Sequence, residues 1–566
     1  MKGLLLIAFL AMLCLGLGSV LSCGDDDDDD SGGGDDAADD DTTDDDSTDD
    51  DITDDDTSDD DSADDDTTDD DTTDDDSTDD DTGDDDTVVE KRLYIFDDTA
   101  PFPWSGWMGD PNPGGGKQVD IMNPNAYEGV YSVHVYIDGS NLWDGVWARV
   151  HDWWDAPGTD WRGASEICYT IKAELNETVK VIWMEDNQTG IDCASRYVTG
   201  DGEWHEFCEP VDGCPGLESV QNVFGFTTNT GEQDIYFDEI YVVFLRPVET
   251  PANVTIETSA GPQHQMMVDG DPFFVKGFGH NWWNWKDDIF SIYPHLADDF
   301  DLMVDASGNT VRNWSVTNMT FQTLDLMREK GLYLLAMLWM LQGDEAVVDY
   351  TDLTYRQAVR RTALNFVECF KDHPAVLAWL FGNEVFNSLQ PVEDATVEQN
   401  REGFAQLLGE IATEIHESDP NHPVGHAGVC AEYVELVVEY APSLDFWGSN
   451  AYECIDAVVN DAQTAGWEGP ILFTEFGPVG WWEFPGDWCT DYSDEAQAAD
   501  IRSHYEDYIA GQCELVLGGS AFAWYDKIDP DAPCDGWGII EDDEGRAPKP
   551  QYLTLSEVYS NPTPCE

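Results

Sequence analysis

The chain has 566 residues, with 120 Asp and Glu against 24 Lys and Arg, and a formal net charge of −96. A length of this order allows two or three domains of roughly 100–200 residues each, which excludes a single small module. So few basic residues exclude nucleic acid and anionic membrane surfaces as partners, because both attract positively charged proteins. The 22 Trp argue against disorder of the whole chain and suit a neutral ligand with stackable faces, such as a sugar.

The first 22 residues predict export. Residues Met1 to Ser22 contain one Lys and an apolar run too short to span a membrane, and Cys23 follows directly. We expect a bacterial lipoprotein signal peptide over residues 1–22 with Cys23 as the lipidated residue; an ordinary signal peptide with an incidental Cys is the alternative. The protein should then be anchored to the cell envelope, at the outer membrane with surface exposure, or be secreted, and it should touch the membrane only through its lipid.

Residues 23–87 predict an extended acidic stalk. The segment Asp25 to Asp86 holds 38 Asp and no other charged residue, mostly as triplets that repeat every five residues. Charge repulsion and the near absence of apolar side chains leave nothing to offset chain entropy, so we expect this stretch to be disordered. A calcium-binding tract is the alternative, although the triplets lack the glycine turns of a dedicated loop.

Eleven cysteines follow Cys23, which in an exported chain predicts several disulfides and one cysteine left over. Their pairing cannot be derived from spacing. A zinc site is not expected, because the sequence holds no CxxC and no cluster of Cys with His.

Residues 88–250 favour an all-β sandwich. Short runs rich in aromatic and β-branched residues alternate with Gly, Pro, Asn and Asp clusters, and no helical period is sustained. The predicted strands are Arg92 to Phe96, Tyr131 to Ile137, Glu166 to Lys172, Val179 to Met184, His205 to Cys208 and Ile235 to Phe244.

Residues 251–566 change to apolar strands that alternate with amphipathic helices, for example Tyr355 to Phe370 and Asn400 to Glu417. The eight predicted strands are Phe273 to Gly277, Thr310 to Trp314, Tyr333 to Trp339, Val376 to Phe381, Pro423 to Ala427, Phe446 to Ser449, Ile471 to Glu475 and Ala521 to Trp524. This number and rhythm predict an α/β domain of the (β/α)₈ barrel type, with the active site at the carboxyl ends of the strands.

Two carboxylates occupy the expected places. Glu384 ends the fourth predicted strand and Glu475 ends the seventh, each after an apolar run where an acid is costly unless it has a function. Either alone would suit a structural role, but the pair at two strand ends favours catalysis.

These residues and their neighbours give the last 300 or so residues a resemblance to the clan A glycoside hydrolases, which are retaining (β/α)₈ enzymes. The resemblance implies that Asn383-Glu384 supplies the acid/base and Glu475 the nucleophile. It further implies substrate-binding roles for Arg312 near the nucleophile, Asn383 at the sugar 2-hydroxyl, Tyr452 beside the nucleophile, Trp524 as a sugar platform, and His280, Asn281 and His426. Arg312 as a barrel salt bridge, Tyr452 and Trp524 as core aromatics, and His426 as a structural histidine are the alternatives.

A retaining mechanism needs two carboxyls about 5–5.5 Å apart, one protonated and one ionised. We expect Arg312 to hold Glu475 ionised, and the apolar residues Trp379 and Phe381 with nearby negative charge to keep Glu384 protonated. No cofactor is expected for catalysis.

Within the clan, Gly382-Asn383-Glu384-Val385 is similar to β-1,3-glucanosyltransferases, whereas Thr474-Glu475-Phe476-Gly477 is equally like β-galactosidase, β-glucuronidase and mannanase domains. The resemblance implies hydrolysis of a β-linked polysaccharide or oligosaccharide of the glucan or mannan type by a monomeric enzyme. A transglycosidase with the same residues, and a catalytically silent carbohydrate-binding surface protein, are the alternatives.

The β domain resembles jelly-roll, galactose-binding-like carbohydrate modules. That resemblance implies a structural Ca²⁺ held by Asp97, Glu128 and Asp238, which offer oxygen ligands. Candidates for sugar stacking in this domain are Trp104, Trp107, Trp143, Trp147, Trp153 and Trp154.

Overall fold

The computed structural model describes the chain from Val88 to Cys565. The residues it leaves undescribed in that span are 102–103, 107–116, 138–143, 150–157, 176, 187–190, 229–231, 260–262, 281–294, 315, 317–318, 339–347, 393–394, 481–490, 526–535, 537, 542–545 and 564. The predicted signal peptide, Cys23 and the acidic stalk lie outside the described residues, and so do Asn281, Trp107, Trp143, Trp153 and Trp154. All described elements belong to one unit that begins at Asp86.

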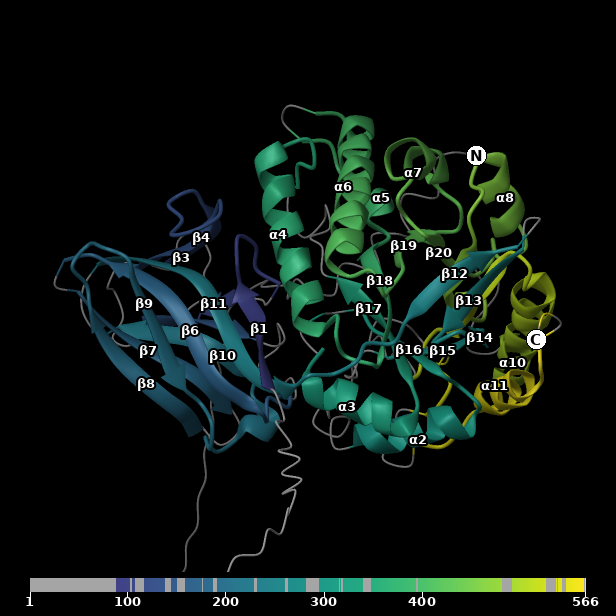
Figure 1. The fold of residues 1–566 in the computed structure, drawn as a ribbon, viewed down its shortest axis with the longest axis horizontal. Helices are drawn as coiled ribbons and strands as arrows, with labels where there is room; N and C mark the ends of the chain where they lie inside the picture. The colour runs from purple at the N-terminus through teal and green to yellow at the C-terminus, as the bar shows by residue number, and fades with distance from the viewer. Residues whose placement is uncertain are drawn as a thin grey trace, which may run out of the picture. The chain divides into compact units, whose positions relative to one another are not determined.

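The first part of this unit is a sandwich of two antiparallel sheets (Figure 1). One sheet contains, in spatial order, β3 (Lys117–Asn123), β4 (Ser132–Ile137), β11 (Gln233–Pro247), β6 (Ala164–Ala173) and β9 (His205–Pro210), with β1 (Val88–Phe96) paired to β11. The other contains β2 (Trp104–Gly106), β5 (Asp144–Arg149), β10 (Asn222–Thr228), β7 (Thr178–Asp186) and β8 (Ile191–Thr199). A short 3-10 helix, Leu217–Ser219, precedes β10.

Alternation of side chains builds the sandwich core. In β4, Val133, Val135 and Ile137 are buried, while His134 and Tyr136 lie on the outer face. Each of the six strands predicted in this domain is confirmed. The prediction missed β10, for example, because this central strand is buried along its whole length and therefore shows no alternation.

Disulfides cross-link both domains, as the cysteine count predicted. The sandwich contains Cys168–Cys208 and Cys193–Cys214, and the barrel domain contains Cys430–Cys454 and Cys513–Cys565. Among the described cysteines, Cys369 is unpaired and buried.

The second part is a closed barrel of eight parallel strands, which confirms the predicted fold class. The strands, in order, are β15 (Val275–Gly279), β16 (Thr310–Arg312), β17 (Tyr333–Leu338), β18 (Val376–Asn383), β19 (Val424–Val429), β20 (Phe446–Ala451), β21 (Ile471–Phe476) and β22 (Val516–Ala521). A three-stranded sheet of β12 (Val254–Thr258), β13 (His264–Val268) and β14 (Asp271–Phe273) precedes them.

The eighth strand corrects the sequence prediction. The strand ends at Ala521, where the predicted strand begins. The sequence prediction missed it because its centre is the pair Gly518-Gly519, which lacks an apolar pattern. Gly518 has φ +120° and lies against Val275 of β15, so that a Cβ there would come within 2.2 Å of the Val275 carbonyl oxygen. The close approach of two strands explains the glycine.

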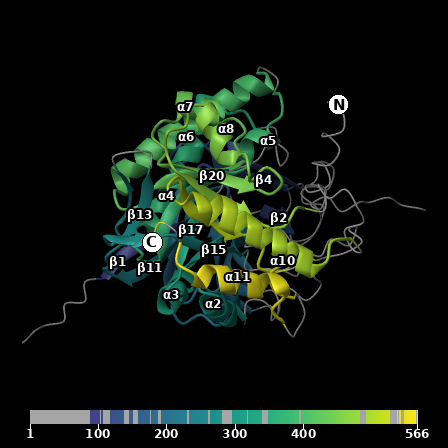
Figure 2. The ribbon, with the colours of Figure 1, turned by 90° about the vertical axis from the view of Figure 1, so that its right-hand side faces the viewer.

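Helices cover the barrel, and several begin at side-chain caps. Asp352 caps α4 by accepting from the Thr354 amide, and Thr396 with Gln399 forms a capping box at α6. The helices are α2 (Leu296–Asp305), α3 (Phe321–Lys330), α4 (Leu353–Phe370), α5 (Val385–Ser388), α6 (Val397–Ser418), α7 (Val434–Tyr440), α8 (Val458–Thr464), α10 (Asp494–Ser503) and α11 (Pro550–Ser560), with π- and 3-10-helical turns at His504–Ile509 and Ala510–Gln512. Figure 2 shows α10 beside α11, where Gln551 donates to Gln497. Among the described residues, no helix is long and apolar enough to cross a membrane.

The predicted calcium site stays a prediction, and the structure shows which groups contact its carboxylates. Asp97 and Glu239 bind the guanidinium of Arg361 from α4, with nitrogen–oxygen distances of 2.7 Å each. Asp238 accepts from the backbone amides of Tyr127, Glu128 and Glu239. Among the described residues, Asp97, Glu128 and Asp238 do not gather into a group of ligand atoms. The Arg361 guanidinium from the barrel therefore brings positive charge to Asp97 and Glu239.

Candidate active site

Glu384 is held by the backbone at the end of β18. The strand ends at Asn383, and Glu384 turns into α5 with φ +55°, a conformation that non-glycine residues rarely adopt. Its amide donates to the Ala427 carbonyl of β19 at 2.7 Å, which fixes the turn. The carboxyl thereby lies at the carboxyl ends of the strands, as predicted.

Glu475 lies in β21 and accepts three hydrogen bonds. Arg312 Nη1 donates to Oε1 at 2.5 Å, Trp314 Nε1 donates to the same oxygen at 2.8 Å, and the Tyr452 hydroxyl donates to Oε2 at 2.6 Å. The side chain of Arg312 is fully buried and that of Glu475 is nearly so. Three donors, one of them cationic, stabilise the ionised carboxylate and orient it.

A chain of amides joins the two carboxyls. Asn450 Nδ2 donates to Glu384 Oε1 at 2.7 Å and to Asn383 Oδ1 at 3.0 Å. The same Asn383 oxygen accepts from Arg312 Nη2, and Arg312 Nη1 donates to Glu475. The Thr474 hydroxyl donates to Asn450 Oδ1 at 2.8 Å, so that the amide nitrogen of Asn450 must face Glu384.

The two carboxyls have opposed environments. Burial, together with the negative charge of Glu475, raises the pKa of Glu384 to about 7, and the Asn450 hydrogen bond opposes this rise. Burial and the charge of Glu475 also raise the pKa of Tyr452 well above its ordinary value, so its hydroxyl keeps the proton that it donates. The pair can therefore hold one proton near neutral pH, on Glu384.

His280 follows β15 and belongs to a second polar cluster. Its Nε2 lies 3.1 Å from Asp299 Oδ2, and Asp299 also binds the hydroxyl of Tyr525 and the guanidinium of Arg546. Burial, with the charge of Arg546, lowers the pKa of His280 to about 3, which makes the imidazole neutral. Its role toward substrate stays a prediction.

His426 and Trp524 are both buried. His426 contacts the Phe381 carbonyl through Nδ1 at 2.7 Å and packs against Phe386 and Trp447, and burial lowers its pKa to about 4. Trp524 is 1% exposed and packs edge-on against Phe278. These surroundings favour the structural alternatives for both residues, and the substrate-binding roles that the resemblance implies for them stay predictions.

Trp314 and Asn450 are site residues that the sequence analysis did not select. Trp314 lies two residues after Arg312, and the Arg312 guanidinium stacks 4.2 Å from its ring centroid. Asn450 lies two residues before Tyr452, on the same strand end. Their signal was adjacency to a selected residue at a strand terminus, but nothing in their own residue type separates them from ordinary core positions.

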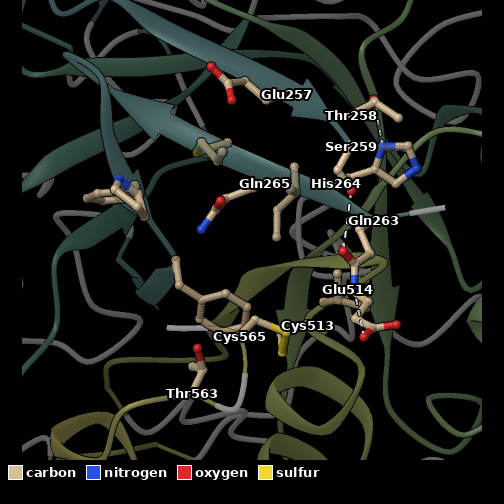
Figure 3. Close-up of a pocket in the computed structure, with 16 residues that line it drawn as sticks. Glu257, Thr258, Ser259, Gln263, His264, Gln265, Cys513, Glu514, Thr563 and Cys565 are labelled. Carbon is tan, nitrogen blue, oxygen red and sulfur yellow. Dashed lines mark hydrogen bonds between the residues drawn. A yellow bond between two sulfur atoms is a disulfide. The ribbon is translucent and has the colours of Figure 1, made fainter. Parts of the chain in front are cut away.

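A cavity of about 320 Å³ lies at the other end of the barrel and is distinct from this site. It is lined by residues of β12–β14, by the start of β22 and by the tail around the Cys513–Cys565 disulfide (Figure 3). Gln263 and Glu514, at its edge, are joined by a hydrogen bond of 2.8 Å. Because β15 and β22 begin here, this cavity lies at their amino ends, away from Glu384 and Glu475.

Comparison with known proteins addresses the barrel. Residues 262–480 match the family model described as "Glycosyl hydrolases family 2, TIM barrel domain". No curated protein matches the chain.

Solved structures with a detectable likeness include three glycosidases. A family 2 β-galacturonidase from Eisenbergiella tayi is 13% identical, with 78% of this chain and 71% of that chain covered and a TM-score of 0.42. A β-glucuronidase from Bacteroides uniformis is 13% identical, with 79% and 51% covered and a TM-score of 0.44. A β-glucuronidase from Ruminococcus gnavus is 12% identical, with 74% and 88% covered and a TM-score of 0.44. These likenesses do not define a substrate for this chain.

The closed barrel, the paired carboxylates and the family match define a class. The barrel matches the family 2 glycosyl hydrolase barrel model over residues 262–480 and resembles the clan A glycoside hydrolases, and the protein is an enzyme that hydrolyses O-glycosyl bonds. The match and the two carboxyls support a retaining β-glycosidase, a class whose reaction needs no cofactor.

Proposed function

We propose that this protein cleaves a β-linked polysaccharide of the glucan or mannan type by double displacement, with Glu475 as nucleophile and Glu384 as acid/base. The observation that carries the proposal is the continuous hydrogen-bonded path from Glu384 through Asn450, Asn383 and Arg312 to Glu475. Three donors stabilise one carboxyl as an anion, and burial favours the proton on the other, which is the division of labour that retention requires.

In the first step, Glu475 Oε attacks the anomeric carbon while Glu384 gives its proton to the departing glycosidic oxygen. The covalent glycosyl-enzyme then places its ester at Glu475, and the charge left on Glu384 makes it a base. In the second step, Glu384 takes a proton from water, whose oxygen attacks the same carbon and releases Glu475. Arg312 and Tyr452 remain bound to Glu475 throughout, so they stabilise it again as a leaving group.

A neutral sugar is the substrate that the charge pattern supports best. From Thr87 onward the chain carries 82 acidic and 23 basic residues. The cation that reaches the nucleophile, Arg312, is already engaged by Glu475 and Asn383. A carboxylated sugar would have to approach an acidic protein in which Arg312, the cation at the nucleophile among the described residues, is already paired.

The test uses near-isosteric variants. Glu384→Gln and Glu475→Gln should each lower kcat on the cleaved polysaccharide by at least about 10³-fold with the fold intact, because each amide removes a proton or a nucleophile but keeps the packing. The exposed Glu329→Gln serves as the control and should keep parental activity. Either active-site variant that retains more than a few per cent of activity would show that its role is misassigned.

Azide separates the two roles further. It should rescue Glu475→Ala with an inverted glycosyl azide, and rescue Glu384→Ala with a retained one on substrates whose leaving group needs no acid. The opposite pattern would exchange the assignments.

A polysaccharide panel with product analysis defines the substrate. It should include glucans, mannans and uronic acid polymers, and chromatography would distinguish hydrolysis from transfer to a second sugar. Longer products than the substrate would establish the transglycosidase alternative. A protein that binds a polymer but cleaves none, with both Glu residues intact, would establish the silent binding protein.

We also propose that the mature protein is anchored to the cell envelope through a lipid on Cys23. The support is the short apolar run before Cys23. Mass spectrometry of the mature amino terminus should find diacylglycerol on Cys23, and Cys23→Ser should abolish the modification. An unmodified Cys23 would support the alternative, an ordinary signal peptide with an incidental Cys.

A further inference from the structure

The outer face of the sandwich carries a row of aromatic side chains. The patch consists of Tyr127, His134, Trp204 and Tyr236 with Lys172, and we call it the sheet-face patch. Register places His134 of β4 beside Tyr236 of β11, and Tyr236 beside Lys172 of β6. Trp204 directly precedes β9, the neighbour of β6, and Tyr127 stands in the loop before β4.

The rings of the sheet-face patch lie next to one another. Tyr127 and Trp204 have centroids 5.8 Å apart, Trp204 and Tyr236 have centroids 6.4 Å apart, and His134 stacks on Tyr236 at 4.4 Å. The Lys172 ammonium lies 6.0 Å from the Trp204 ring and 5.7 Å from the Tyr236 ring. A continuous aromatic surface therefore crosses at least three strands.

This surface is separate from the sandwich core. The neighbours of Tyr236 along β11, Ile235 and Phe237, are fully buried, so Tyr236 points the other way. Tyr127 is 47% exposed, and Trp204 is partly exposed. Contiguous exposed aromatic side chains of this kind mark binding surfaces more often than scattered single ones.

Polar groups stand beside the rings. Asp234 binds His134 at 2.7 Å, and Glu232 accepts from the Tyr136 hydroxyl at 2.8 Å. Among the described residues, neither the Lys172 ammonium nor the Trp204 indole nitrogen has a hydrogen-bond or carboxylate partner. Within the described part of the chain, the Lys172 ammonium therefore offers its donors beside an aromatic plane.

We propose that the sheet-face patch is a binding site for a pyranose oligosaccharide. Because the ring planes of Trp204 and Tyr127 are tilted by 56°, one pyranose ring stacks its apolar C–H face on Trp204 and a neighbouring ring stacks on Tyr127, while Lys172 donates to sugar oxygens. Flat rings with adjacent donors and acceptors match a pyranose, which has apolar faces and an equatorial rim of hydroxyls. Only the choice of polymer in this proposal rests on the proposed function. It places substrate capture on residues other than the tryptophans selected from the sequence, of which Trp147 is 1% exposed.

The test measures binding in the full chain with Glu475→Gln, so that polymer is not consumed. Affinity gel electrophoresis would use the glucans, mannans and uronic acid polymers of the activity panel. Tyr127→Ala and Trp204→Ala should each weaken retardation about tenfold, because each removes a stacked ring. The matched control is Tyr197→Ala, a tyrosine on β8 that is 64% exposed and should leave retardation unchanged.

The outcomes are separable. A selective loss in the two patch variants supports the proposal whether or not Glu475→Gln abolishes catalysis, and a further loss in Lys172→Gln on the uronic polymer alone would identify an acidic sugar as the ligand. If Trp204→Ala does not fold, the exposed Tyr127 decides. A parent chain that no polymer retards, or an equal response of all three tyrosine and tryptophan variants, would overturn the proposal.

Discussion

At the residue scale, the site depends on which hydrogen bonds reach each carboxyl. Glu475 receives three donors, whereas Glu384 receives one described side-chain donor, from Asn450. Burial therefore dominates at Glu384 and raises its pKa to about 7. The protonated form of Glu384 starts the reaction, so we expect kcat/KM to fall as the pH rises above about 7.

Asn450 should set the position of that fall. Its amide donates to the Glu384 carboxyl and so favours the ionised form, which holds the pKa of Glu384 lower than burial alone would. Asn450→Ala should move the falling limb of the pH profile upward by about one pH unit, which corresponds to the loss of one charge-assisted hydrogen bond. Profiles of kcat/KM on a small chromogenic glycoside would measure it, with the exposed Asn460→Ala as control. A limb that stays in place, or moves down, would refute this role.

Glu384 should also affect stability. Its pKa in the folded protein, about 7, lies above its ordinary value of 4.5, so the native state binds more protons than the unfolded state between these pH values. Stability is therefore lost as the pH rises through this window. Glu384→Gln removes the loss and should raise Tm by about 3 °C at pH 8, with no gain at pH 4. Scanning calorimetry would measure the Tm of Glu384→Gln, of the control Glu329→Gln and of the parent. If Glu384→Gln and the parent had the same Tm at pH 8, the account would be wrong.

The sequence could place Glu384, Glu475, Arg312 and Tyr452 together because each lies at or beside the carboxyl end of a barrel strand and because their order along the chain resembles that of a known family. It could not identify Asn450 or Trp314, whose contribution depends on how two strands far apart in sequence meet. Asn450 lies 66 residues from Glu384, and only barrel closure brings the two together.

At the scale of elements, the contact between β11 and α4 places a cation beside acidic residues of the sandwich. An acidic cluster at strand ends resembles a calcium site in sequence, but the barrel supplies Arg361, which contacts Asp97 and Glu239. Sequence alone could not place a residue of the second domain against the first. The same holds for β22, whose glycines make sense only beside β15.

Arg361→Met should therefore destabilise the protein by about 2–3 kcal/mol, because it leaves the carboxylates of Asp97 and Glu239 without their positive partner. Arg162→Met, which removes a surface pair with Asp160, should cost less than about 1 kcal/mol. Urea unfolding would measure both. A parent Tm that is higher in millimolar Ca²⁺ than in EDTA would support the predicted calcium site, and an equal Tm would show that no calcium ion stabilises the fold.

At the scale of the whole molecule, the acidic stalk should contribute nothing to catalysis. The residues that the structure describes begin at Val88, after the predicted stalk. Deletion of Asp25 to Asp86 should leave kcat and Tm of the soluble enzyme unchanged, because 38 Asp supply no apolar contact to a core. On cells, the shortened protein should degrade insoluble polymer more slowly. An unfolded or inactive soluble deletion protein would contradict this.

The central claim is that Glu475 is the nucleophile of a retaining enzyme. The most direct test incubates the enzyme with mechanism-based inactivators in gluco, manno, galacto and glucurono configurations and maps the adduct by peptide mass spectrometry. We predict a single glycosyl ester on Glu475, absent in Glu475→Gln and formed more slowly in Glu384→Gln. An adduct on Glu384 or another residue, or the release of products with inverted anomeric configuration, would contradict the account.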